Sequence, residues 1–199
     1  MKKFELTNEF ITNMFGTKLF RIRALVEFGD VEAGELGGYV EKESNLGHDD
    51  NAWVYDNAWV YGNAWVYGDA QVSGDARVYD NAWVYGDAQV SGDARVYGNA
   101  RVYGNAWVYG NALVCSDEDY AYAHGFGSVN RTTTFFRLKD GGVGVRCGCF
   151  YGTLAQFRDK IRETHGETKK AQEYLMLADL MELRFEEDEN EVGNRKYVE

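Results

Sequence analysis

The chain has 199 residues, enough for one or two domains, and a formal net charge of −11. Sequence-independent binding to nucleic acid needs a basic surface that displaces counterions, so this acidic balance argues against direct nucleic-acid binding. The three cysteines form neither an even disulfide framework nor the paired spacing of a zinc site, and no apolar run has the length of a membrane span. We expect a soluble cytoplasmic protein that meets no membrane and uses no cofactor.

Alternating apolar and polar side chains predict a β-hairpin at the start of the chain. Its two runs are residues 2–13 and 17–28, on either side of Gly16. A connector rich in turn residues follows, up to Gly38. We therefore assign residues 1–37 to an N-terminal β cap.

A six-residue unit repeats eleven times without a gap between Asp50 and Cys115. The units are DNAWVY, DNAWVY, GNAWVY, GDAQVS, GDARVY, DNAWVY, GDAQVS, GDARVY, GNARVY, GNAWVY and GNALVC. A period this short is typical of a solenoid, in which each unit buries its apolar side chains against neighbouring units. Degraded units begin at Gly38, and residues 47–49 contain a two-residue insertion before the regular array.

Each unit predicts a very short strand followed by a corner. In the Ala-x-Val part, Ala and Val point to one side, whereas the x residue and the following Tyr or Ser point to the other. The Gly-Asn, Gly-Asp or Asp-Asn pair supplies the corner, because Gly and Asn tolerate positive φ. The blocks 68–85 and 86–103 differ at only two positions, which supports three units in each 18-residue coil.

The recurring Val, the small Ala and the turn pair resemble the hexapeptide-repeat family. Members of that family fold as left-handed parallel β-helices with three units per triangular coil, and they usually trimerise. The resemblance covers residues 38–115 and implies the same hand and coil for this chain. The expected fold is mainly β: a left-handed parallel β-helix over 38–115, capped by the N-terminal hairpin and followed by a small C-terminal α+β segment.

The C-terminal segment, residues 116–199, begins where the repeat stops. Residues 121–150 have the β-preferring composition and the Gly-containing turns of several strands. Thr153 is the predicted N-cap of a helix over 154–164, and residues 168–187 carry apolar side chains at the spacing of a second amphipathic helix.

The positions that vary between units point outward and form three files, one on each side of the coil. The candidate interface residues in these files are Trp59, Arg77 and Arg95 beside Tyr61, Tyr79 and Tyr97; Trp65, Trp83 and Arg101; and Trp53 and Trp107. All five tryptophans then point outward, and exposed aromatic patches indicate an interface. The first partner that we expect is another copy of the chain, in a dimer or trimer. The alternative is that like side chains only stack between coils.

The arginine file offers a second kind of binding. Arg77 and Arg95 lie one coil apart and could share a phosphate while Tyr79 or Tyr97 stacks on a base. The competing interpretation is that these arginines separate bulky rings and keep the surface soluble.

Catalysis needs groups that the repeat does not contain. The family resemblance implies a histidine base beside an acyl-CoA groove in an acyltransferase, but no histidine lies within residues 50–115. His124 is the only candidate catalytic residue, and a structural or solvated histidine is the alternative. Cys147 and Cys149 flank a glycine in a predicted strand, where we expect buried cysteines on one face rather than a metal or redox site. We expect neither an enzyme nor a metal site.

The flanks carry a second resemblance. The phrases LFRIRALVEFGDVEAGELGGYVEKESNLGHD and CGCFYGTLAQF are similar to those of small phage and prophage proteins of Gram-positive gut bacteria that carry hexapeptide arrays. This resemblance implies a phage context. Our hypothesis is a non-catalytic phage-encoded binding protein in the host cytoplasm that oligomerises through its β-helix and engages a host protein, as an inhibitor of a host defence system. Two alternatives stay open: a sponge that sequesters a small nucleotide signal, and a hexapeptide-type acyltransferase that uses His124.

Overall fold

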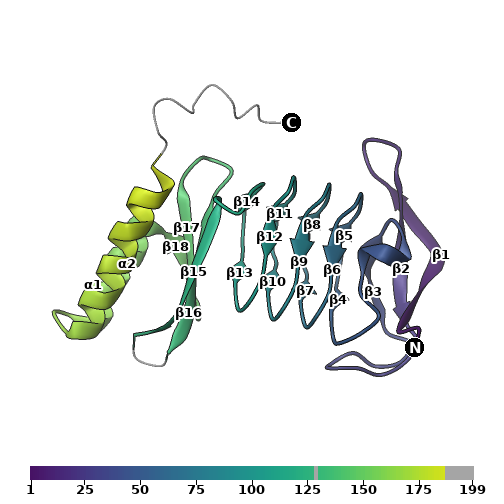
Figure 1. The fold of residues 1–199 in the computed structure, drawn as a ribbon, viewed down its shortest axis with the longest axis horizontal. Coiled ribbons are helices and arrows are strands. Elements are labelled where there is room, and N and C mark those ends of the chain that lie inside the picture. The colour runs from purple at the N-terminus through teal and green to yellow at the C-terminus, as the bar shows by residue number, and fades with distance from the viewer. Residues whose placement is uncertain (128–129, 187–199) are drawn as a thin grey trace.

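The computed structural model describes residues 1–127 and 130–186, and a β-solenoid occupies the middle of its long axis (Figure 1). The eleven units give eleven two-residue strands. These are β4 (Trp53–Val54), β5 (Trp59–Val60), β6 (Trp65–Val66), β7 (Gln71–Val72), β8 (Arg77–Val78), β9 (Trp83–Val84), β10 (Gln89–Val90), β11 (Arg95–Val96), β12 (Arg101–Val102), β13 (Trp107–Val108) and β14 (Leu113–Val114). The predicted solenoid is confirmed.

The strands stack in parallel with a register of 18 residues, so that Gln71 pairs with Gln89 and Gln89 with Trp107. Three stacks result, which we call the β4 side (β4, β7, β10, β13), the β5 side (β5, β8, β11, β14) and the β6 side (β6, β9, β12). Three units therefore form one coil. The left hand of the coil stays a prediction from the family resemblance.

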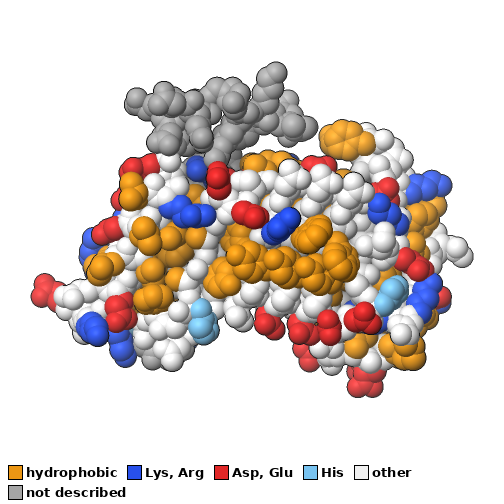
Figure 2. Space-filling view, in the orientation of Figure 1, with side chains coloured by type: hydrophobic (Ala, Val, Ile, Leu, Met, Phe, Trp, Pro, Cys, Tyr) orange, Lys and Arg blue, Asp and Glu red, His pale blue; other side chains and the backbone are white. Residues whose placement is uncertain are grey.

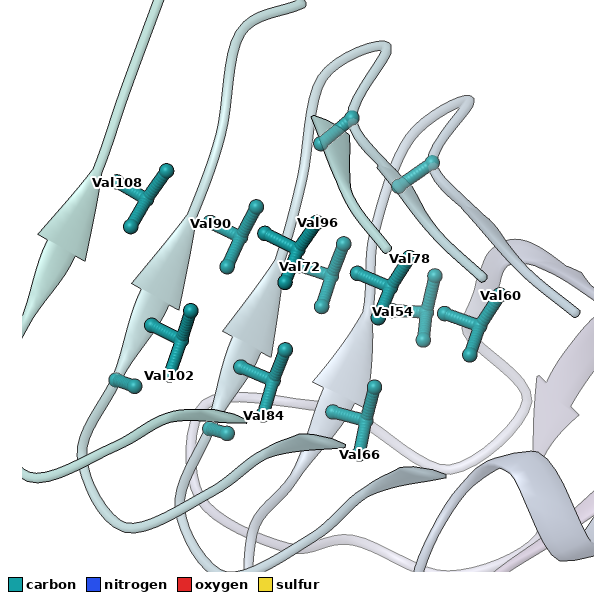
Figure 3. Packing of buried hydrophobic residues seen from close by; sticks show 14 of the residues in the cluster. Val54, Val60, Val66, Val72, Val78, Val84, Val90, Val96, Val102 and Val108 are labelled. Atoms are coloured by element: carbon teal, nitrogen blue, oxygen red, sulfur yellow. The ribbon is translucent and has the colours of Figure 1, made fainter. Parts of the chain in front are cut away.

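The interior of the coil is built from the Ala and Val of each unit. All of these side chains are buried, and the valines lie in rows along the axis (Figure 3). Valine suits this position because its branched side chain is stiff and packs well on a pleated surface. The repeat therefore supplies a continuous apolar core although each strand is only two residues long.

The first residue of every unit has positive φ, whether it is glycine or aspartate. The sequence predicts this conformation for Gly and Asn, and the structure adds Asp. Aspartate is accommodated because its carboxylate accepts a backbone hydrogen bond from the coil above: Asp56 from Gly74 N at 3.0 Å and Asp80 from Gly98 N at 3.3 Å. The hydrogen bond offsets part of the cost of a left-handed L-residue.

The N-terminal cap continues the sheet of the β5 side. Strands β1 (Phe4–Thr12) and β2 (Lys18–Ala24) form the predicted hairpin, β2 pairs antiparallel with β3 (Leu36–Val40), and β3 pairs in parallel with β5. Tyr39 pairs with Trp59 and Leu46 with Val66, both 20 residues away. This register confirms the two-residue insertion. A short 3-10 helix, η1 (Glu43–Asn45), directly precedes Leu46 and contacts β6.

The C-terminal segment closes the other end of the solenoid with an antiparallel sheet and two helices. The sheet consists of β15 (Tyr120–Phe126), β16 (Arg131–Arg137), β17 (Val143–Cys147) and β18 (Phe150–Thr153), followed by α1 (Leu154–His165) and α2 (Lys169–Phe185). Both predicted helices are confirmed, including the Thr153 N-cap, whose Oγ1 accepts from Gln156 N. The end of the second predicted helix, residue 187, lies outside the described residues.

The sheet separates two cores because its side chains alternate between two faces. Phe136 packs with the solenoid core, whereas Phe135 and Val145 pack with the helices. Thr134 Oγ1 accepts a hydrogen bond from Trp107 N at 2.9 Å. The threonine thus supplies an acceptor for a backbone N–H of β13, which is the last strand of its stack. Within the described ranges, no helix has the length and apolar character needed to cross a membrane.

Candidate binding surfaces

The β6 side carries the most exposed aromatic surface of the solenoid. We call it the aromatic stripe, and it consists of Trp65, Tyr67, Trp83, Tyr85 and Tyr103. Trp65, Trp83 and Tyr103 are 39%, 36% and 42% exposed. Figure 2 shows a continuous hydrophobic band across the middle of this side of the molecule. The stripe is thus a contiguous apolar patch on the protein surface.

The rings of the stripe stack on one another. Tyr67 stacks on Tyr85 at 4.9 Å between ring centroids, and Tyr85 stacks on Tyr103 at 5.4 Å. Trp65 stacks on Tyr67 at 4.0 Å, and the Arg101 guanidinium lies 5.1 Å from the Trp83 ring. Because ring faces are used in these internal contacts, the stripe presents mainly ring edges and hydroxyl groups. Such a surface suits contact with another protein better than stacking of a sugar or a base.

The β4 side is covered at both ends by the chain's own caps. Trp53 is fully buried beneath Phe28, with ring centroids 5.3 Å apart, and Phe4, at 6.2 Å. The prediction that all five tryptophans form exposed surface is therefore wrong for Trp53: its ring leaves the coil, but the N-terminal cap lies over it. At the other end, Trp107 is half-buried and the Arg146 guanidinium lies 4.0 Å from its ring.

The β5 side holds the arginine file. Arg77 lies 4.3 Å from the ring of Trp59 and pairs in the ladder with Arg95. Tyr79 is stacked between Tyr61 and Tyr97, with 5.1 Å between centroids in both pairs. Both faces of the Tyr79 ring are therefore occupied, so the predicted stacking of a base on this ring is wrong. Burial raises the pKa of Tyr61 to about 12 and also raises the pKa of Tyr79.

The three histidines lie in different surroundings. His124 is exposed on β15, and its Nδ1 lies 2.8 Å from Thr132 Oγ1. His48 stacks on Phe4 in the N-terminal cap, where burial lowers its pKa, and His165 stacks on Tyr174 at the end of α1. In the part of the chain that the structure describes, no group of three or more His, Cys, Asp or Glu could hold a metal ion.

Cys147 and Cys149 do not share a strand face, which corrects our expectation. Cys147 ends β17 and pairs with Phe150, so Gly148 and Cys149 form the turn between β17 and β18. Gly148 has φ +58°, and Cys149 is exposed. The Cys147 thiol instead faces the helices, where it accepts from Thr133 Oγ1 at 3.2 Å.

A cleft that sequence reasoning missed lies between the end of the solenoid and the C-terminal sheet. We call it the end cleft, and it has a volume of about 400 Å³. Its lining residues are Asp87, Gln89, Asn105, Ala106, Trp107, Arg131, Thr132 and Gly148. Its walls are the corner and β4 side of the last coils, the first two residues of β16 and the turn at Gly148. The available signal was the run of three consecutive threonines at residues 132–134, but the sequence around them does not show which coil they contact.

The fold and the repeat define a β-solenoid repeat protein. Its repeats are similar to the YdcK beta solenoid repeat, whose family model matches residues 52–68, 70–86, 88–104, 94–110 and 100–116. All of these windows lie in or directly beside the eleven units, and the flanking segments are not matched by that model. Among curated proteins, no match is found.

Proposed function

We propose that the chain is a non-catalytic binding protein that contacts another protein through the aromatic stripe. The observation that carries this proposal is the exposure of Trp65, Trp83 and Tyr103 together on one side of the solenoid. The same outward position is covered by the chain's own residues at Trp53 and Trp107. Large apolar side chains that stay exposed and contiguous in a folded protein indicate a protein interface.

A second copy of the chain is the first partner that we propose. Two copies of a chain with a net charge of −11 repel each other, so a self-association surface has to be poor in acidic groups. The side chains of the stripe are uncharged. The charged side chain that contacts them is Arg101 on β12, which is basic. A two-fold or three-fold closed assembly through this side fits these features.

A host protein is the second partner that we propose, and inhibition of a defence component is the biological role. This part of the proposal is supported only by the resemblance of the flanks to phage and prophage proteins. The narrower membership in the hexapeptide-repeat family is supported by the unit sequence and by three units per coil. A cytoplasmic location is consistent with three cysteines that form no disulfide in the structure.

The self-association test uses residues that the repeat itself supplies. Glutamine occupies the position of Trp65 and Trp83 in two other units, as Gln71 and Gln89, so the double variant Trp65→Gln, Trp83→Gln should keep the fold. We expect sedimentation velocity to show an oligomer for the wild type and a monomer for this variant. Arg95→Gln, on the β5 side, is the matched control and should remain oligomeric. A wild type that is monomeric at every concentration, or a variant that still assembles, contradicts the use of the stripe.

The host-target test places a photo-crosslinking amino acid at Trp83 and, as control, at Gln89 on the β4 side. The protein is produced in host cells, irradiated and analysed by mass spectrometry. We expect a host protein to be crosslinked from position 83 and not from position 89. Equal crosslinking from both positions, or from neither, contradicts the proposal.

A further inference from the structure

The end cleft is lined by an aromatic residue, Trp107, and an arginine, Arg131, that the proposed protein interface does not use. On the solenoid wall, the Trp107 indole borders the cleft beside Gln89, its partner in the ladder. The Arg146 guanidinium lies 4.0 Å from that ring and 4.7 Å from the Tyr109 ring. The aromatic wall is therefore backed by a positive charge, which favours an electron-rich or anionic ligand in front of it.

The corner of the solenoid adds hydrogen-bonding groups of both kinds. Asp87 and Asn105 occupy the same corner position in successive coils, 18 residues apart, and both line the cleft with Gln89. The carboxylate only accepts hydrogen bonds, whereas the two carboxamides donate and accept. This combination matches the edge of a nucleobase, which presents donors and acceptors side by side.

The opposite wall presents a positive charge. Arg131 is exposed at the start of β16, and within the described residues it forms no ion pair with a carboxylate. Its Nη1 lies so close to Gly148 that a Cβ at this position would clash with it. The glycine therefore leaves room for the guanidinium across the turn between β17 and β18. Thr132 also lines the cleft, and its Oγ1 lies 2.8 Å from His124 Nδ1.

We propose that the end cleft binds a nucleotide. Arg131 and the Thr132 hydroxyl receive the phosphate, because a guanidinium fork matches phosphate oxygens. The base lies at Trp107, with its polar edge toward Gln89, Asn105 and Asp87. The Asp87 carboxylate repels phosphate from the corner and accepts from an exocyclic amine, so it fixes the orientation of the ligand. The volume of about 400 Å³ is in the range of small-molecule sites.

The nucleotide could be free in solution or the end of a nucleic-acid strand. A net charge of −11 opposes binding along a strand, so we assign the free nucleotide. This site lies on a different side from the aromatic stripe and is independent of the proposed function. Loss of the stripe through Trp65→Gln, Trp83→Gln should leave nucleotide binding unchanged, so the two proposals fail separately.

The experiment is isothermal titration of the full chain with the four ribonucleoside 5′-monophosphates, with inorganic phosphate and with a 5′-phosphorylated oligonucleotide. We expect at least one mononucleotide to bind, and to bind at least tenfold more weakly to Arg131→Gln and to Trp107→Gln. Glutamine at position 107 continues the file of Gln71 and Gln89, so the fold should tolerate it. Asp87→Asn should reduce the preference for bases with an exocyclic amine, and Arg95→Gln is the control for loss of a positive charge.

Two results overturn the proposal. The first is the absence of heat with every mononucleotide and with the oligonucleotide. The second is binding that persists unchanged in both Arg131→Gln and Trp107→Gln, which would place the ligand elsewhere. Binding of the phosphorylated oligonucleotide alone, abolished by Arg131→Gln, would support the same phosphate and base contacts but assign them to a strand end.

Discussion

Nζ of Lys3 lies 2.8 Å from the carbonyl oxygen of Ala52 and donates a hydrogen bond to it. Lys3 is buried, and it also donates to the Asp50 carbonyl at 3.2 Å. Both carbonyls belong to the first coil of the regular array. On the β4 side no earlier coil precedes it, so no backbone N–H of a preceding strand donates to them. The third residue of the chain thus replaces a missing ladder of backbone donors.

Lys3 predicts a pH dependence of stability. Burial lowers its pKa from 10.5 to about 8, and nearby acidic residues, Asp50 first, offset part of this effect. Between pH 8 and 10.5 the unfolded chain therefore binds more protons than the folded chain, so this group makes the protein more stable as pH rises. We expect the difference in free energy of unfolding between wild type and Lys3→Met to grow by roughly 1 to 2 kcal/mol from pH 7 to pH 9.5. Urea unfolding at both pH values measures it, and a difference independent of pH would contradict the lowered pKa of Lys3 in the folded state.

The second prediction concerns Asp119, a buried carboxylate at the end of the solenoid. It accepts from Cys115 N and Ser116 N, each at 3.0 Å, and lies 3.5 Å from Arg137 Nε on β16. Asp119→Ala removes the partner of these buried donors, so we expect a loss of about 3 kcal/mol in the free energy of unfolding. The exposed Asp93→Asn, which installs a residue that other units use, should change stability by less than about 0.5 kcal/mol. Equal effects of the two substitutions would show that Asp119 does not join the solenoid to the sheet.

A feature of this molecule could be predicted from the sequence when it depends on residues close together in the chain, and not when it depends on contacts between distant segments. The 18-residue coil could be predicted because residues 68–85 and 86–103 repeat the same pattern of core and corner residues. The burial of Trp53 could not be predicted, because Trp53 and Trp65 occupy the same position in the repeat unit and only the N-terminal cap distinguishes them. The same limit applies to the end cleft, in which Trp107 and Arg131 meet only after the sheet docks on the last coil. Local periodicity determines the core, whereas contacts between segments determine which outer side stays open.

The third prediction uses the tyrosine stack on the β5 side. Burial raises the pKa of Tyr61 from 10 to about 12, so the neutral phenol stabilises the fold below pH 10, and this contribution is lost as pH rises toward 12. We expect wild type to lose about 1 kcal/mol more than Tyr61→Phe between pH 9 and pH 11. Thermal unfolding at matched ionic strength measures the difference. If Tyr61→Phe loses as much stability as the wild type, the phenol is not buried in the stack.

The fourth prediction tests the corner of the coil at Gly86. Its φ is +69°, and a Cβ there would lie 3.0 Å from Gly104 N. Gly86→Ala should therefore reduce the free energy of unfolding by about 2 kcal/mol, through left-handed strain and this contact. Gly86→Asp should cost about 1 kcal/mol less than Ala, because its carboxylate can accept from Gly104 N as Asp80 accepts from Gly98 N. Urea unfolding of the two variants gives the comparison. A less stable aspartate variant would mean that repulsion from the adjacent Asp87 outweighs the hydrogen bond, and that the aspartates at the start of other units are tolerated for another reason.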